Sequence, residues 1–143
     1  MLGRFLEISV RAPDVPASLA FYESLGFVQA PVGDVFSHPY AVITDGRLHL
    51  GLHARDFDAP ALTWVQPDLA AHAADLRTLG IELAFERLGD DALHELGFLD
   101  PSGQMVTLLE ARTFSPPALP PVHTTQLGYF EEFGVPTTDL ERA

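Results

Sequence analysis

The chain has no cysteine among its 143 residues. Disulfide bonds, thiolate metal sites and a cysteine nucleophile are therefore excluded. A chain of this length can bury one compact core without such cross-links, but it is too short for two independent domains of ordinary size.

Basic residues are scarce, with 8 Lys and Arg against 20 Asp and Glu and a net charge of −12. No basic cluster is present that could follow a phosphate backbone, so a nucleic-acid partner is not expected. Two interpretations of the acidity stay open. The charge can serve solubility, or it can line a cleft that attracts a cationic ligand.

Long hydrophobic runs are also missing, since no stretch approaches the eighteen or so apolar residues of a membrane span. The amino-terminal sequence MLGRFLEISV lacks the basic start and the longer apolar segment of a signal peptide. No membrane partner is expected, and the cytoplasm is the expected compartment.

The main feature that is present is an internal repeat of about fifty residues. EISV at 7–10 is followed by Asp14, and ALTW at 61–64 is followed at the same distance by Asp68. In both copies a Leu-Gly pair comes at the same distance after the aspartate. The sequence therefore predicts two structurally equivalent modules.

The first module is predicted to be β-α-β-β-β. A strand over 4–10 precedes a helix that Asp14 caps and Gly26 ends. Strands follow over 27–30, 40–44 and 47–52, the last two joined by the hairpin signal Asp45-Gly46.

The second module repeats this order. Its predicted elements are a strand over 62–65, a helix between Asp68 and Gly80 with Leu69, Ala73 and Leu76 inward, and strands over 81–87, 94–99 and 104–109. The segment DPSG at 100–103 predicts the turn before the last strand.

A proline-rich segment follows at 113–126, with TFSPPALPPV at 113–122 reading as an extended linker. Beyond it, LGYFEEFGVPTTDLERA at 127–143 copies the opening of the chain, with EFGV at 132–135 in the frame of 7–10. We interpret 127–143 as the start of a further, truncated module of a tandem protein.

The segment DVPASLAFYESLGF at 14–27, the DPSG turn at 100–103 and the duplicated β-α-β-β-β order resemble the vicinal oxygen chelate superfamily. That superfamily includes glyoxalase I, bleomycin-resistance and fosfomycin-resistance proteins, and extradiol dioxygenases. The resemblance covers about residues 4–112. It implies an α+β, glyoxalase-like domain over 1–112, in which modules 1–57 and 58–112 form a curved mixed sheet around a cleft. It also implies a homodimer.

In metal-binding members of that superfamily, four inward strand positions hold one divalent ion, and these fall here on Glu7, His49, Ala61 and Thr107. The four residues are the expected ligand-binding set. Glu7 and His49 can act as metal ligands, whereas Ala61 has no donor and Thr107 offers a hydroxyl where the motif has a glutamate. Glu7 is also the candidate catalytic acid or base. His53, two residues from His49 on the same strand face, is interpreted as a polar residue at the end of the strand.

Three functions stay open. The first is a bleomycin-resistance-like protein that binds a small organic molecule between the modules without a complete metal site and without a cofactor. The second is a metal-dependent glyoxalase-like lyase or isomerase, or a dioxygenase. The third is a non-catalytic half of a tandem two-domain protein.

Overall fold

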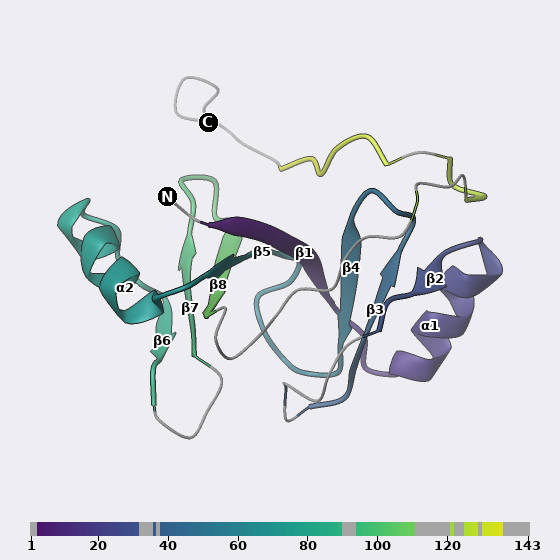
Figure 1. Ribbon diagram of the computed structural model, residues 1–143, viewed down its shortest axis with the longest axis horizontal. Coiled ribbons are helices and arrows are strands. Elements are labelled where there is room, and N and C mark those ends of the chain that lie inside the picture. Colours follow the sequence, from purple (N-terminus) through teal and green to yellow (C-terminus); the bar gives the residue numbers. More distant parts are fainter. Residues whose placement is uncertain are drawn as a thin grey trace.

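Eight strands form one mixed sheet, and two helices pack on the same face of it near opposite ends (Figure 1). The computed structural model describes residues 3–31, 36, 38–89, 94–110, 121, 125–128 and 130–135. The elements are β1 (Arg4–Arg11), α1 (Val15–Ser24), β2 (Val28–Gln29), β3 (Tyr40–Thr44), β4 (His49–His53), β5 (Ala61–Gln66), α2 (Leu69–Thr78), β6 (Phe85–Arg87), β7 (Glu95–Leu99) and β8 (Met105–Glu110).

The strand order β2-β3-β4-β1-β5-β8-β7-β6 divides into two equivalent halves. In each half the first strand pairs in parallel with the last, β1 with β4 and β5 with β8. The halves meet where β1 and β5 pair antiparallel, with Ile8 opposite Leu62. The predicted α+β fold of two β-α-β-β-β modules in one mixed sheet is confirmed.

Each helix begins at the predicted aspartate. The side chain of Asp14 accepts a hydrogen bond from the amide of Ala17 at 3.0 Å, and Asp68 accepts one from Ala71 at 3.3 Å. Such caps satisfy amide groups that the helix itself cannot pair. Gly26 follows α1 with a φ of 105°, a backbone conformation that favours glycine.

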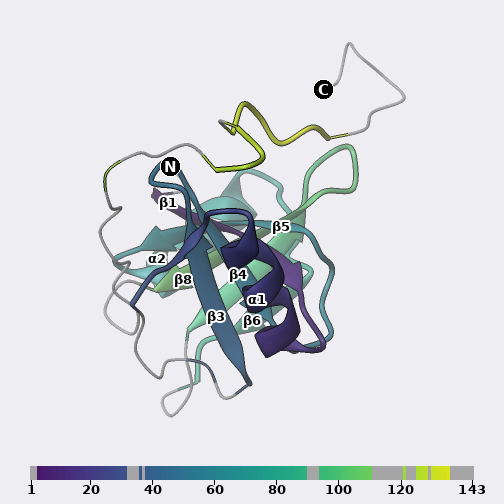
Figure 2. The same ribbon diagram turned by 90° about the vertical axis from the view of Figure 1, so that its right-hand side faces the viewer.

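Each helix covers a hydrophobic cluster of its own module, so the core has two parts. Leu69, Ala73 and Leu76 of α2 are buried against β7 and β8, as predicted from their spacing. The first cluster joins Val15 at the start of α1 to Ile43 and other residues of β3 and β4. Figure 2, with α1 toward the viewer, shows the twist of the sheet between its two ends.

The two outer strands are shorter than the sequence predicts. The segment 27–30 is a strand only over Val28–Gln29, and 81–87 only over Phe85–Arg87, although Ala30 and Ala84 each donate one further backbone hydrogen bond to the neighbouring strand. Both strands lie at a sheet edge with one partner each. Ile81 and Leu83 pack against the α2 cluster instead of pairing.

The predicted linker at 113–126 lies outside the described residues except for 121, 125 and 126. The further module predicted over 127–143 is described only at 127–128 and 130–135, and no strand is assigned there. This segment, yellow in Figure 1, runs along one side of the sheet. Within the described part of the chain, no helix combines the length and apolar character needed to cross a membrane.

Candidate functional site

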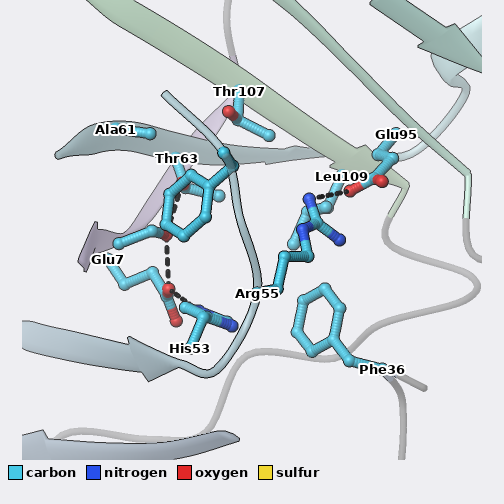
Figure 3. A pocket seen from close by; sticks show the side chains of 11 residues that line it. Glu7, Phe36, His53, Arg55, Ala61, Thr63, Glu95, Thr107 and Leu109 are labelled. Carbon is cyan, nitrogen blue, oxygen red and sulfur yellow. Dashed lines mark hydrogen bonds and ion pairs between the residues drawn. The ribbon is translucent and has the colours of Figure 1, made fainter. Parts of the chain in front are cut away.

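A cleft opens on the sheet face that the helices leave free (Figure 3). Its enclosed volume is about 30 Å³, enough for a water molecule or two. Five strands and the connections around them supply its lining, which consists of Glu7, Ser9, Phe36, His53, Arg55, Phe57, Ala61, Thr63, Glu95, Thr107 and Leu109. Anything larger than a small polar group must extend out of this space.

Strand register brings the polar residues of the cleft together. Glu7 pairs with Thr63 across the central antiparallel contact, and Thr63 pairs with Thr107 across the parallel one. Ser9 lies opposite Ala61 in the same way. Because side chains alternate along a strand, residues two apart on β1, β5 and β8 point into the same cleft.

Glu7 is the centre of a buried hydrogen-bond network and is only 3% exposed. Its Oε2 accepts hydrogen bonds from Ser9 Oγ at 2.5 Å and from His53 Nε2 at 2.8 Å. Ser9 Oγ lies 2.9 Å from Thr63 Oγ1, which extends the network into the second module. Both of these hydrogen bonds are to Oε2, and within the described residues Oε1 of Glu7 has no such partner.

The network continues from His53 to His38. His38 Nε2 lies 2.9 Å from Nδ1 of His53. Since an ionised carboxylate only accepts, His53 donates from Nε2, and in its neutral form its Nδ1 accepts from Nε2–H of His38. Three groups are thus joined in one directional chain, from His38 through His53 to Glu7.

Aromatic rings surround the outer end of this chain. Tyr40 stacks on the ring of His53 with centroids 5.8 Å apart, and Phe36 contacts both imidazoles edge-on or tilted. Burial lowers the pKa of His38 to about 4, and His53 and Arg55 add smaller effects in the same direction, opposed by Glu7. His38 is therefore neutral at pH 7.

The connection between the modules covers the other side of the cleft. Arg55 reaches Glu95 at 3.4 Å, and Glu95 also pairs with Arg87 at 2.6 Å. Phe57, from the same connection, adds an aromatic wall. The two carboxylates of the cleft thus differ in their partners. Two arginines pair with Glu95, whereas no arginine contacts Glu7 among the described residues.

His49 lies on β4 but is not among the residues that line the cleft. It is buried, and its Nε2 has no hydrogen-bond partner in the described part of the chain. Burial lowers the pKa of His49, against smaller upward effects of a hydrogen bond to the Leu6 backbone and of the Glu7 charge. The family resemblance thus pairs Glu7 with His49, whereas the structure joins Glu7 to His53.

The donor set does not fit a protein-held divalent ion. Ala61 carries no donor, Thr107 offers a neutral hydroxyl, and Oε2 of Glu7 already accepts two hydrogen bonds. Within the described ranges, no group of three or more His, Asp or Glu residues is arranged to hold a metal. Catalytic metal sites ordinarily use three protein ligands.

Of the four positions expected to bind ligand, the structure places Glu7, Ala61 and Thr107 around one cleft and His49 outside its lining. The sequence reasoning did not select Ser9 and Thr63, although both share the strand alternation of their neighbours. His53 is the last residue of β4, where it was expected, but it is buried and hydrogen-bonded to Glu7, which the sequence reasoning did not anticipate. No sequence signal places the loop residue His38 beside His53.

Several solved structures share this fold. A variant of Streptomyces coelicolor methylmalonyl-CoA epimerase, in complex with 2-nitronate-propionyl-CoA, has a TM-score of 0.55 and 22% identity over 81% of this chain and 100% of that chain. Methylmalonyl-CoA epimerase from Mycobacterium tuberculosis has a TM-score of 0.52 and 16% identity, covering 75% of this chain and 87% of that chain.

A third similar structure is an NAD-dependent benzaldehyde dehydrogenase from Legionella pneumophila, with a TM-score of 0.57 and 16% identity over 73% of this chain and 96% of that chain. The names of these proteins describe different reactions, so the shared fold does not identify the chemistry. No protein-family model and no curated protein matches the chain.

Proposed function

Since the chain has the glyoxalase-like fold of the vicinal oxygen chelate superfamily, we propose that its cleft binds a small organic molecule without a protein-held metal. Glu7 is the anchor. The observation that carries this proposal is the buried carboxylate of Glu7, which Ser9 and His53 hold by one oxygen while the other has no partner among the described residues.

The surroundings of Glu7 indicate the class of ligand. A buried carboxylate favours a cationic or hydrogen-bond-donating group, and the aromatic rings of Phe36 and Phe57 line the same space. The net charge of −12 acts in the same direction over longer distances. The enclosed space suits an ammonium head group, and the remainder of the ligand would extend past Phe57.

Benzylamine, benzyl alcohol and benzoate test this directly, because they share a ring and differ in charge. Ligand-observed NMR and thermal unfolding should detect benzylamine and give little response to the other two. Glu7→Gln should weaken benzylamine binding about tenfold or more, because a hydrogen bond to a charged group contributes about 1.5–3 kcal/mol. The fold should be retained.

Glu23→Gln is the matched control, since Glu23 is exposed on α1. It removes the same charge and should leave binding unchanged. Coenzyme A is a further comparator, because the S. coelicolor epimerase structure contains a CoA ester. Binding of benzoate or coenzyme A in the cleft, or equal benzylamine affinity in wild type and Glu7→Gln, would contradict the proposal.

A second candidate is proton-transfer chemistry of an isomerase or lyase, favoured by the hydrogen-bonded chain from His38 to Glu7. A proton from solvent joins Nδ1 of His38, the Nε2 proton of His38 passes to Nδ1 of His53, and the Nε2 proton of His53 passes to Glu7. One proton reaches the carboxylate and both rings end neutral in the opposite tautomer. Reverse transfer restores them, as an acid–base group requires.

Nitrogen-detected NMR of the histidine rings tests the second candidate without a substrate. We expect Nε2–H tautomers for both rings, and at least tenfold slower solvent exchange of the His53 Nε2 proton in His38→Phe. His72→Phe, in α2, is the matched control and should not change that rate. Unchanged exchange in His38→Phe, or Nδ1–H on His53, would exclude the route.

A homodimer is also part of the proposal, on the resemblance to the superfamily alone. Light scattering of the full chain at several concentrations measures its molar mass in solution and so distinguishes a dimer from a monomer. A monomer at every concentration would remove the dimer while leaving the cleft proposal untouched, because every residue named for the cleft belongs to one chain.

A further inference from the structure

A second and much larger cavity lies on the sheet face opposite the cleft. Ile8 and Val10 line it, whereas their neighbours Glu7 and Ser9 point into the cleft. Its volume is about 470 Å³, within the range of about 300–1,000 Å³ found for small-molecule sites. We name it the rear chamber. Its other apolar walls include Tyr22, Phe27, Leu50, Leu127, Phe130 and Phe133.

The two modules differ in the size of a side chain at this part of the sheet. Val10 and Trp64 occupy the same position of the repeated tetrapeptides EISV and ALTW. In the second module the indole of Trp64 packs against the cluster beneath α2. In the first module the smaller side chain of Val10 packs against the cluster beneath α1 and also lines the chamber.

Residues within 125–128 and 130–133 also line the chamber. The amide of Gln126 donates to the carbonyl of Leu25 at the end of α1, at 2.7 Å. Gly26 allows the approach, because a Cβ there would lie 3.3 Å from Cα of Thr125. Phe130 and Phe133 both line the chamber, and Phe130 is 38% exposed. Exposed aromatic residues beside an apolar cavity are typical of a binding site.

The charges of the lining select the kind of ligand. Asp45 and Glu131 are its ionisable acidic residues, and no arginine or histidine lines it among the described residues. The carboxylate of Asp45 accepts from the backbone amides of Arg47 and Leu48, so it is held in place. An anionic ligand would therefore meet repulsion without a basic partner.

We propose that the rear chamber is a binding site for a hydrophobic small molecule that is neutral or cationic. This site is separate from the cleft, since the two cavities share no lining residue. The ligand would lie between the face of β1 that carries Ile8 and Val10 and the aromatic residues Phe130 and Phe133. A chain with two sites on opposite faces of one sheet can bind a polar molecule at one and an apolar molecule at the other.

Two naphthylamine dyes test the chamber, because they differ chiefly by a sulfonate group. The neutral dye N-phenyl-1-naphthylamine should give saturable fluorescence at one dye per chain. The anionic dye 1-anilinonaphthalene-8-sulfonate should bind at least tenfold more weakly. Equal affinities, or no saturable binding of the neutral dye, would overturn the assignment of the ligand class.

Val10→Trp reproduces in the first module the residue found in the second and should fill the chamber. We expect at least a tenfold loss of affinity for the neutral dye. Val28→Trp is the matched control, since Val28 is 44% exposed on the edge strand β2 and lines no part of the chamber. Phe133→Ser gives an independent test if Val10→Trp does not fold, and it should also weaken dye binding.

Unchanged dye affinity in both Val10→Trp and Phe133→Ser would overturn the location. One dye bound per two chains, with light scattering showing that the dye-bound species is a dimer, would assign the chamber to an interface and overturn the small-molecule site. Glu7→Gln should leave dye binding unchanged, so failure of the cleft proposal and failure of this one can be distinguished.

Discussion

Gly51 lies directly against the carboxylate of Glu7. A Cβ built on Gly51 would overlap both oxygens of Glu7, and no other group is among its three nearest neighbours. Gly51 pairs with Ser9 across β1 and β4, so the missing side chain leaves the space in which Glu7 meets its two partners. The Glu7 carboxylate can take this position because residue 51 is a glycine, which has no side chain to fill the space.

Gly51→Ala should displace Glu7 without unfolding the chain. The carboxylate is the end of a flexible side chain and can move, but it then loses Ser9 and His53. We expect at least tenfold weaker benzylamine binding and a loss of about 1–3 kcal/mol in unfolding free energy, as for other overpacked sites. Gly134→Ala is the control, because nothing lies within 4 Å of a Cβ there. Full binding by Gly51→Ala would show that Glu7 is not the anchor.

The contact between Glu7 and His53 should appear as a coupling energy. Each of Glu7→Gln and His53→Gln leaves a buried partner imperfectly satisfied, at a cost of about 1–3 kcal/mol in unfolding free energy. The double variant should cost less than the sum by about 1 kcal/mol or more, because the two changes remove one interaction. Urea unfolding of the four proteins gives the cycle. Additive costs would mean that the 2.8 Å contact contributes nothing to stability.

Stability should fall with pH below 6.5 partly because of His38. Its pKa is about 4 in the folded chain, mainly through burial, against 6.5 unfolded. Above pH 6.5 neither state binds the proton. Between 6.5 and about 4 only the unfolded chain does, so the unfolding free energy falls as pH falls, and the effect levels off below about 4.

Urea unfolding of wild type and His38→Gln across this pH range isolates that contribution. The groups that shift the pKa of His38 are His53, Arg55 and Glu7, and all three remain in the variant. The wild-type unfolding free energy should fall more steeply than that of His38→Gln. Parallel pH curves would show that His38 is not buried as described.

Glu110 should be a structural residue of the second module. Its Oε2 lies 2.6 Å from Nδ1 of His94, and its Oε1 accepts from the amide of Leu69 at the start of α2. Glu110→Ala removes one partner of a buried pair and should cost about 3 kcal/mol in unfolding free energy. Glu86→Ala breaks the more exposed pair with Arg77 and should cost less than about 1 kcal/mol. Similar costs for the two variants would contradict this assignment.

Most of the fold could be predicted because its determinants are local and repeated. Asp14 and Asp68 mark the helix starts, Asp45-Gly46 marks the hairpin, and the two tetrapeptides fix the central strands. Strand lengths at the edges could not be predicted, since a neighbouring strand decides whether residues such as Ile81 pair or turn into the core.

The candidate site could be predicted only where strand alternation determines it. Glu7, Ala61 and Thr107 point inward by alternation and meet through register. The partner of Glu7 could not be chosen between His49 and His53, because both lie on the same face of β4. His38 comes from a loop, and its distance from His53 depends on tertiary packing that no local pattern encodes.

The cleft is shared between the two modules, with Glu7 and His53 from the first and Thr63, Thr107 and Glu95 from the second. Its floor is completed only when β8 pairs beside β5, and β8 is the last strand in the order of the chain. During synthesis nearly the whole domain therefore leaves the ribosome before the cleft can be completed. A nascent chain that stalls before residue 105 lacks Thr107 and Leu109, and its cleft stays open on that side.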